Sequence, residues 1–214
     1  MLGAMRGFTA FLTLLGLSLA ASFAAFTVEP AGDQVVDLET GVTVLPDGGK
    51  LVDAERGLEL VADYIEYKEG EFVKAKNARL VRADVRFEAG ELYYDVPAEV
   101  VDLKGGVLFS TDFLKGLKAP EGRLYLKDEV AVLWGGVESE DPYFRAERMV
   151  ADTKGALALL LGEFVYKDAK LGITLRGKGK EARLLLRFLE DGEVEAETEV
   201  PRDILEKLIS YLGG

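Results

Sequence analysis

The sequence predicts an all-β fold of repeated strands with a short C-terminal amphipathic helix. Three observations predict it. A short apolar motif with a fixed alanine recurs in residues 60–67, 87–95 and 144–152. Small-residue segments lie between its copies, and a helical period begins only after Pro201. Short apolar runs separated by Gly, Asp and Pro turns are typical of a sandwich, barrel or β-solenoid, not of alternating β and α units.

The first motif places a large apolar residue two positions before an alanine and another three positions after it. It recurs every 27 to 30 residues or so, with a degenerate copy at 114–119, as expected for one structural unit per copy. Because residues two apart share a face of a strand, Phe87 and Ala89 point to one side and Glu88 to the other. Leu92 follows Ala89 by three positions, so we expect a bulge that returns Leu92 to the apolar side.

A second pattern, in residues 75–80, 103–108, 133–138 and 160–165, contains small residues, most often glycine, between apolar ones. Glycine inside a strand fits a bulge or a close approach of two backbones, because a Cβ would clash there. The alternative is that these glycines form ordinary hairpin turns. The sequence leaves both interpretations open.

A segment dominated by Lys and Arg, residues 167–187, follows the last clear repeat. In a strand, Arg176, Lys178 and Lys180 would share one face, where they could hold a headgroup phosphate through charge-assisted hydrogen bonds. The alternative is a solvated edge whose lysines discourage aggregation. The segment is therefore a candidate headgroup contact.

The end of the chain changes period. Residues 193–199 alternate glutamate with less polar residues, which predicts a last strand with an acidic outer side. Residues 201–214 then predict a helix with one apolar face, formed by Ile204, Leu205, Leu208, Ile209 and Leu212. We expect it to cap an open end of the β structure; contact with a membrane or a partner is the alternative. The acidic loop 138–142 lacks the spacing of a calcium loop, so no metal site is expected.

Residues 1–24 resemble an export signal, with Arg6, an apolar run, and small residues that end at Ala24. Cleavage there would leave residues 27–200 as the β domain. The alternative is an uncleaved anchor, because about 20 mostly apolar residues are enough to cross a bilayer. Both alternatives place the rest of the chain outside the cytoplasm, since the flanking positive charge precedes the apolar run.

Composition excludes several function classes. The chain has no His and no Cys, which removes imidazole and thiolate nucleophiles, disulfides and ordinary zinc sites. Its net charge of −12 repels polyanions, so nucleic acid is not an expected partner. No acid pair stands out among the acidic residues. We therefore expect a protein that is not an enzyme and that needs no cofactor.

The motif segments 62–67, 75–80 and 87–95 resemble the OstA-like repeat of periplasmic lipopolysaccharide-transport proteins, the LptA and LptC type. The resemblance extends over about residues 34–187. It implies a V-shaped β-jelly roll in the periplasm, whose apolar interior holds acyl chains. It also implies partners: lipopolysaccharide or another acylated envelope lipid, and other jelly-roll transport components joined through β-edge pairing. A homo-oligomer formed in this way is possible.

The expected lipid-binding residues are those that alternation or the resemblance places on the apolar interior. They are Leu60, Ala62, Ile65, Tyr67, Phe87, Ala89, Leu92, Tyr94, Trp134, Phe144, Ala146 and Met149. Trp134 is ambiguous, because a single Trp in a β protein also serves as plain core.

Two functions follow from these expectations. The first is a lipid-binding bridge or chaperone that moves lipopolysaccharide or a related envelope lipid toward the outer membrane, either free in the periplasm or tethered to the inner membrane. The second is an envelope scaffold that pairs with partners through its β edges and holds no lipid. They differ at the interior, because a carrier requires a cavity or an open seam and a scaffold can be fully packed.

Overall fold

The structure is a computed structural model that describes residues 26–83, 85–111 and 114–213. The expected signal peptide or anchor, residues 1–24, lies outside the described residues. In the described part of the chain, 17 strands precede one helix and a terminal 3-10 turn. The strands are β1 (Phe26–Pro30), β2 (Val35–Val36), β3 (Thr43–Leu45), β4 (Gly49–Asp53), β5 (Leu58–Ala62), β6 (Tyr64–Lys68), β7 (Phe72–Arg82), β8 (Val85–Asp95), β9 (Val100–Ser110), β10 (Leu117–Ala119), β11 (Glu121–Tyr125), β12 (Val130–Ser139), β13 (Tyr143–Asp152), β14 (Leu157–Asp168), β15 (Ile173–Gly177), β16 (Arg183–Phe188) and β17 (Val194–Glu197). The helix is α1 (Arg202–Ile209), and the 3-10 turn is η1 (Ser210–Gly213).

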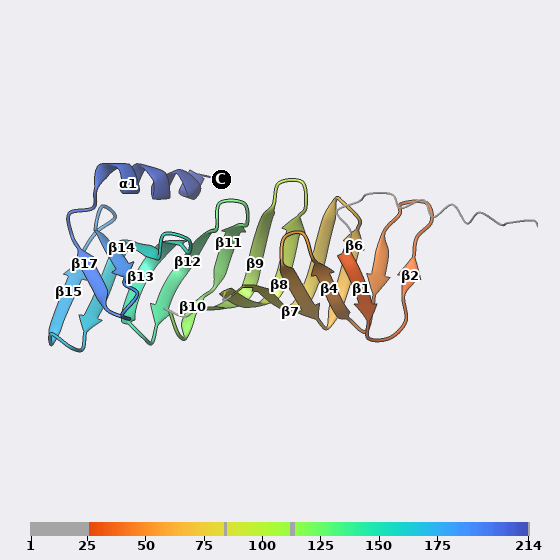
Figure 1. Cartoon of the computed structure of the whole chain (residues 1–214), viewed down its shortest axis with the longest axis horizontal. Helices are drawn as coiled ribbons and strands as arrows, with labels where there is room; N and C mark the ends of the chain where they lie inside the picture. The colour runs from red at the N-terminus through yellow and green to blue at the C-terminus, as the bar shows by residue number, and fades with distance from the viewer. Residues whose placement is uncertain (1–25, 84, 112–113, 214) are drawn as a thin grey trace, which may run out of the picture.

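The strands pair antiparallel and form an elongated molecule, with β2 near one end and β15 and β17 at the other (Figure 1). Six long strands, β7, β8, β9, β12, β13 and β14, each take part in two half-sheets. Half-sheet A also contains β1, β4, β5, β10 and β15. Half-sheet B also contains β2, β3, β6, β11, β16 and β17. The all-β, jelly-roll fold class expected from the sequence is confirmed.

The long strands bend where the two half-sheets join. Their register shifts between Ala89 and Glu91, between Trp134 and Val137, and between Ala146 and Arg148. The predicted bulge after Ala89 is confirmed. The glycines of the second motif lie inside β9, β12 and β14 with positive φ, so their interpretation as hairpin turns is wrong. At one bend, a Cβ on Gly90 would lie 2.9 Å from the Gly105 carbonyl oxygen, so only glycine fits there without a backbone shift.

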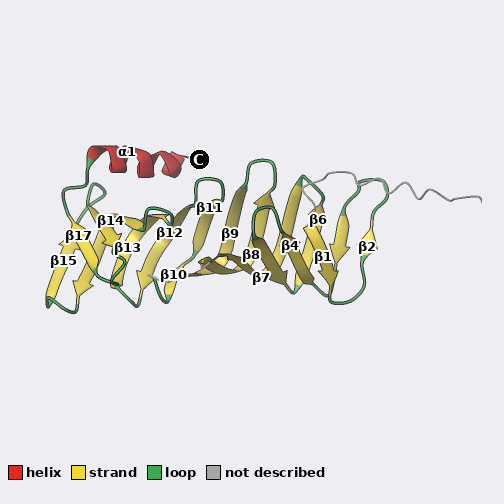
Figure 2. Ribbon diagram, in the orientation of Figure 1, coloured by secondary structure: helices red, strands yellow, loops and turns green. Residues whose placement is uncertain are grey.

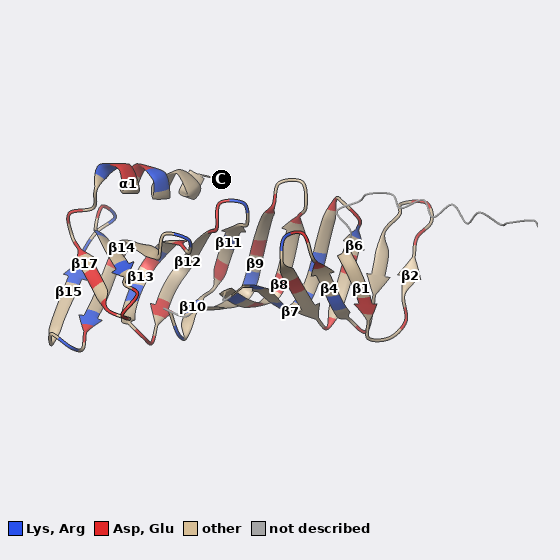
Figure 3. Ribbon diagram, in the orientation of Figure 1, with Lys and Arg blue, Asp and Glu red and all other residues tan. Residues whose placement is uncertain are grey.

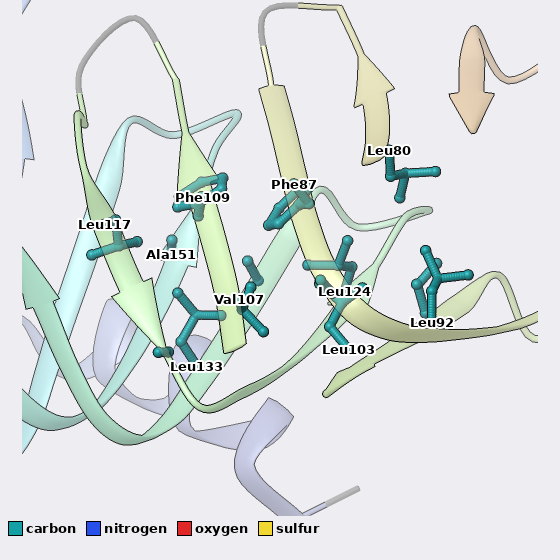
Figure 4. Packing of buried hydrophobic residues seen from close by; sticks show 14 of the residues in the cluster. Leu80, Phe87, Leu92, Leu103, Val107, Phe109, Leu117, Leu124, Leu133 and Ala151 are labelled. Carbon is teal, nitrogen blue, oxygen red and sulfur yellow. The ribbon is translucent and has the colours of Figure 1, made fainter. Parts of the chain in front are cut away.

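The bends set the two half-sheets face to face around one buried apolar cluster. Figure 4 shows side chains of this cluster directed toward one another from both half-sheets. We name it the interior cluster; it includes Leu45, Leu60, Ile65, Leu80, Phe87, Leu92, Tyr94, Val101, Leu103, Val107, Phe109, Leu117, Leu124, Leu133, Phe144, Met149, Leu160, Tyr166, Leu184 and Leu186. Alternation explains its composition, because residues two apart on each strand point to the same side.

The C-terminal helix lies along the outer face of half-sheet B (Figure 2). It covers apolar side chains that point away from the interior, namely Val130, Val132, Val150, Leu159, Leu161 and Leu185. Leu208 is fully buried against them, and Lys207 Nζ lies 2.7 Å from Asp152 Oδ2. The expectation of a cap on an open end is therefore wrong: α1 covers a sheet face because these strands are apolar on both sides. Ile209, expected on the buried face, is exposed.

Candidate functional site

The structure gathers the expected lipid-binding residues, except Trp134, into the interior cluster. They are Leu60, Ala62, Ile65, Tyr67, Phe87, Ala89, Leu92, Tyr94, Phe144, Ala146 and Met149. Residues of the three motif copies thus contact one continuous apolar region that joins both half-sheets. That they bind lipid remains a prediction.

Trp134 is not part of the interior cluster, so the prediction that it lines the interior is wrong. Leu133 is fully buried in the interior cluster, so its neighbour on β12 must point to the outer face of half-sheet B. Trp134 packs there beside the residues under α1, and its Nε1 donates a hydrogen bond to Glu121 Oε2 at 3.2 Å. Alternation along β12 contained the signal for this placement.

The interior is densely filled, with an opening on one side. On the side opposite the bends, the turn 53–58 and Arg82 of half-sheet A lie against the turns 96–99 and 126–129 of half-sheet B, with the turn 153–156 beside them. We name this line the seam. A cavity of about 230 Å³ opens at the seam. Its lining includes Leu58, Leu80, Phe87, Leu124 and Leu126, so an apolar group that enters here meets the interior cluster directly.

Two arginines join the half-sheets across the seam. Arg56 Nε donates to Glu99 Oε1 at 2.5 Å, and Arg56 Nη1 donates to the buried Asp53 Oδ2 at 2.9 Å. These hydrogen bonds, that to Glu99 first, raise the pKa of Arg56 above its ordinary value. Arg82 Nη1 donates to the Leu126 carbonyl oxygen, and Arg82 Nη2 lies 3.6 Å from Glu129 Oε1. We name Arg56 and Arg82 with these partners the seam latches.

Tyr94 lies on the interior face and carries an unusual polar atom. Its side chain is 2% exposed, and its ring packs edge-on against Phe26. Its hydroxyl is buried without a hydrogen-bond partner among the described residues. Burial raises the pKa of Tyr94 from an ordinary value of 10.0 to about 12. An orphaned hydroxyl in an apolar interior is available to a ligand that brings its own polar group.

A buried hydroxyl group without a hydrogen-bond partner lowers the stability of the folded protein, and we expect Tyr94→Phe to remove this cost. At neutral pH the variant should be as stable as the parent or about 1 kcal/mol more stable, because a buried unsatisfied group is gone. Because the pKa of Tyr94 is higher in the folded than in the unfolded protein, the free energy of unfolding does not depend on this group below about pH 10, and it falls as the pH rises toward about 12. Urea unfolding across this range should show the parent losing stability relative to the variant. A stability difference that does not change with pH would contradict the assignment.

The expected headgroup residues come together, although not as predicted. β15 ends at Gly177, so Lys178 and Lys180 lie in the following loop, and the prediction that they share a strand face with Arg176 is wrong. Gly179, with a φ of 84°, has a left-handed backbone conformation that an extended strand does not have. All three residues nevertheless line one groove on the outer surface. They do not line the cavity at the seam.

Within the described ranges, no group of three or more His, Cys, Asp or Glu side chains is placed to hold a metal ion. No helix in the part of the chain that the structure describes is long and apolar enough to cross a membrane.

No protein-family model matches this chain. No curated protein matches it either. Among solved structures, it is similar to the crystal structure of LptH, the LptA homologous periplasmic component of the conserved lipopolysaccharide transport device from Pseudomonas aeruginosa. The two are 13% identical, the match covers 82% of this chain and 96% of that chain, and the TM-score is 0.27.

Proposed function

We propose that this protein is a lipid-binding bridge or chaperone of the bacterial envelope, and not an enzyme. Its cargo is lipopolysaccharide or a related acylated lipid, which it carries through the periplasm toward the outer membrane. The observation that carries the proposal is the apolar interior that opens at the seam, where the cavity wall is continuous with the interior cluster. Acyl chains need no catalytic group or cofactor, only shelter from water.

Burial energetics support a carrier with a seam that opens. Each CH₂ removed from water contributes about 0.8 kcal/mol, so a sheltered acyl chain gains enough to offset the opening of a few surface ion pairs. The cavity of about 230 Å³ lies below the roughly 300–1,000 Å³ of ordinary small-molecule sites. We therefore infer that an acyl chain enters by widening the seam and displacing side chains there.

Substitutions on the two faces of β8 test the proposal. Ala89 lies in the interior, and Glu88 lies next to it in sequence on the outer face, opposite Arg79. Ala89→Leu should fill interior space at a stability cost of about 1–3 kcal/mol from overpacking and should lower the capacity for a fluorescent fatty-acyl probe.

Glu88→Leu is the matched control, because it adds an apolar side chain outside the interior. Its probe binding should equal that of the parent, with circular dichroism verifying the fold of both variants. If folded Ala89→Leu binds the probe as well as the parent does, the interior is not the lipid site.

A second candidate function is an envelope scaffold that pairs with other jelly-roll components, or with its own copies, through sheet edges. The supporting observation is exposed apolar residues on terminal strands: Val35 and Val36 on β2, and Ile173 on β15. Unpaired strand edges bind added strands through backbone hydrogen bonds. Self-association that Val35→Lys abolishes, in a protein that extracts no lipid, would favour the scaffold.

A further inference from the structure

A large groove lies on the outside of the molecule, away from the seam. It has a volume of about 1310 Å³ and runs across the outer surface of β12, β13, β14 and β15, beside η1. Val132 and Trp134, which point away from the interior, contribute to its floor. We name it the outer groove. Val137, Ala146 and Phe164 of the interior cluster also contribute to its lining, and Tyr125 lines both the groove and the cavity at the seam. The other residues of the groove do not line that cavity, so we treat the groove as a second site.

Cations without partners concentrate in the outer groove. Arg148, Arg176, Lys178 and Lys180 line it, and none forms an ion pair with any described residue. Figure 3 shows Lys and Arg on β13 and β15, the strands that carry two of these side chains. In a chain of net charge −12, a local excess of free cations is a specific feature, and it attracts a negatively charged ligand.

Other cations of the groove are already paired. Arg145 Nη2 lies 2.7 Å from Glu138 Oε1, and Arg123 Nε lies 2.6 Å from Asp102 Oδ1. These ion pairs hold the wall in place. The free cations are therefore the groups available to a ligand phosphate, which accepts charge-assisted hydrogen bonds from guanidinium and ammonium groups.

Aromatic and acidic side chains complete the groove. Trp134 is held by its hydrogen bond to Glu121, and Tyr125 packs against Tyr211 with ring centroids 4.9 Å apart. These rings offer apolar faces beside the cations. Glu147 and Glu163 also line the groove and form no ion pair among the described residues. A carboxylate only accepts hydrogen bonds, so both suit a ligand rich in hydroxyl groups.

We propose that the outer groove binds a phosphorylated sugar. The phosphate contacts the free cations, the hydroxyl groups donate to Glu147 and Glu163, and the sugar ring lies against Trp134. A simple anion would use the cations alone and would meet repulsion from the two glutamates. The sugar phosphate can be free in solution or can be the headgroup of a glycolipid; the chemistry that recognises it is the same.

The single tryptophan of the chain reports directly on this site, because Trp134 lies in the groove. Emission is followed while the full chain is titrated with glucose 6-phosphate, with glucose, and with inorganic phosphate. We expect the sugar phosphate to change the emission at lower concentration than either component alone. Phosphatidylcholine vesicles that carry a glucosamine lipid, with or without a phosphate on the sugar, test the headgroup as the source.

Charge-reversal variants then test whether the cations of the outer groove bind the sugar phosphate. Lys178→Glu with Lys180→Glu should weaken sugar-phosphate binding by about tenfold or more, because two charge-assisted contacts become repulsive. Arg86→Glu with Lys104→Glu makes the same change in net charge at exposed positions that line neither the groove nor the cavity at the seam. That control should retain parental affinity apart from a small long-range effect that added salt removes.

Each outcome decides the proposal. Response to the free sugar phosphate, to the phosphorylated vesicles, or to both supports it and identifies the source. Inorganic phosphate that binds as well as the sugar phosphate overturns it, and so does an equal loss in both double variants or the absence of any emission change. Failure of the acyl-probe experiment on Ala89→Leu would leave this result unaffected, because Ala89 does not line the outer groove.

Discussion

Phe87→Ala is expected to destabilise the fold by about 3–5 kcal/mol and, at the same time, to increase the uptake of a fluorescent fatty-acyl probe. Phe87 is buried and stacks on Phe109 with ring centroids 4.6 Å apart. It also lines the cavity at the seam. Removing the ring costs buried contacts and leaves a void, but this void enlarges a cavity that already opens to the surface.

The matched control is Leu184→Ala. Leu184 belongs to the same interior cluster and is fully buried, but it does not line the seam cavity. Its truncation should cost a similar 2–5 kcal/mol without raising probe uptake. Denaturant unfolding gives the stabilities, and probe fluorescence under conditions where both variants are folded gives the uptake. Equal uptake by the two variants would show that the cavity at the seam is only a packing defect.

The second large effect concerns the latch at Arg56. Arg56→Ala leaves the carboxylate of Asp53, whose side chain is 2% exposed, without its ion-pair partner. Removing one member of a buried pair costs about 3–5 kcal/mol; since a quarter of the Arg56 side chain is exposed, we expect about 2–4 kcal/mol. The substitution also removes the contact with Glu99 across the seam, so probe uptake should become faster.

Lys50→Ala provides the comparison for this latch. It breaks an ion pair with Glu59 that lies on the surface of half-sheet A and does not cross the seam. The expected cost is below about 1 kcal/mol, with an unchanged uptake rate in a stopped-flow measurement. If Arg56→Ala loses stability and takes up the probe no faster than Lys50→Ala does, the latch is structural and does not control the opening.

Alternation and the position of the bulge were sufficient to predict the interior. The three-residue step from Ala89 to Leu92 required a bulge, and the structure has a register shift there. The step preserves an apolar inner face along β8, and the same reasoning applies to Ala146 and Met149 on β13. Local pattern decides which side of a strand is buried, so this part of the fold can be predicted from one sequence.

The seam could not be predicted, because its contacts join residues far apart in the chain. Arg56 and Glu99 are separated by 43 positions, and each resembles an ordinary charged turn residue. Trp134 was misplaced because a single aromatic residue was assigned by type and not by its neighbour Leu133. The position of α1 depends on strands that are apolar on both faces. For β14, the sequence does indicate this property, because residues 157–161 form a continuous apolar run.

The central claim is that acyl chains reach the interior through the seam, and a reversible lock across it tests this most directly. The chain has no cysteine, so Arg56→Cys with Glu99→Cys places the only two thiols on opposite sides of the seam. A bismaleimide with a reductively cleavable spacer joins them, and uptake of the fatty-acyl probe is measured before joining, after joining and after cleavage. We predict rapid uptake, then loss of uptake, then recovery. Unchanged uptake by the joined protein would contradict the claim.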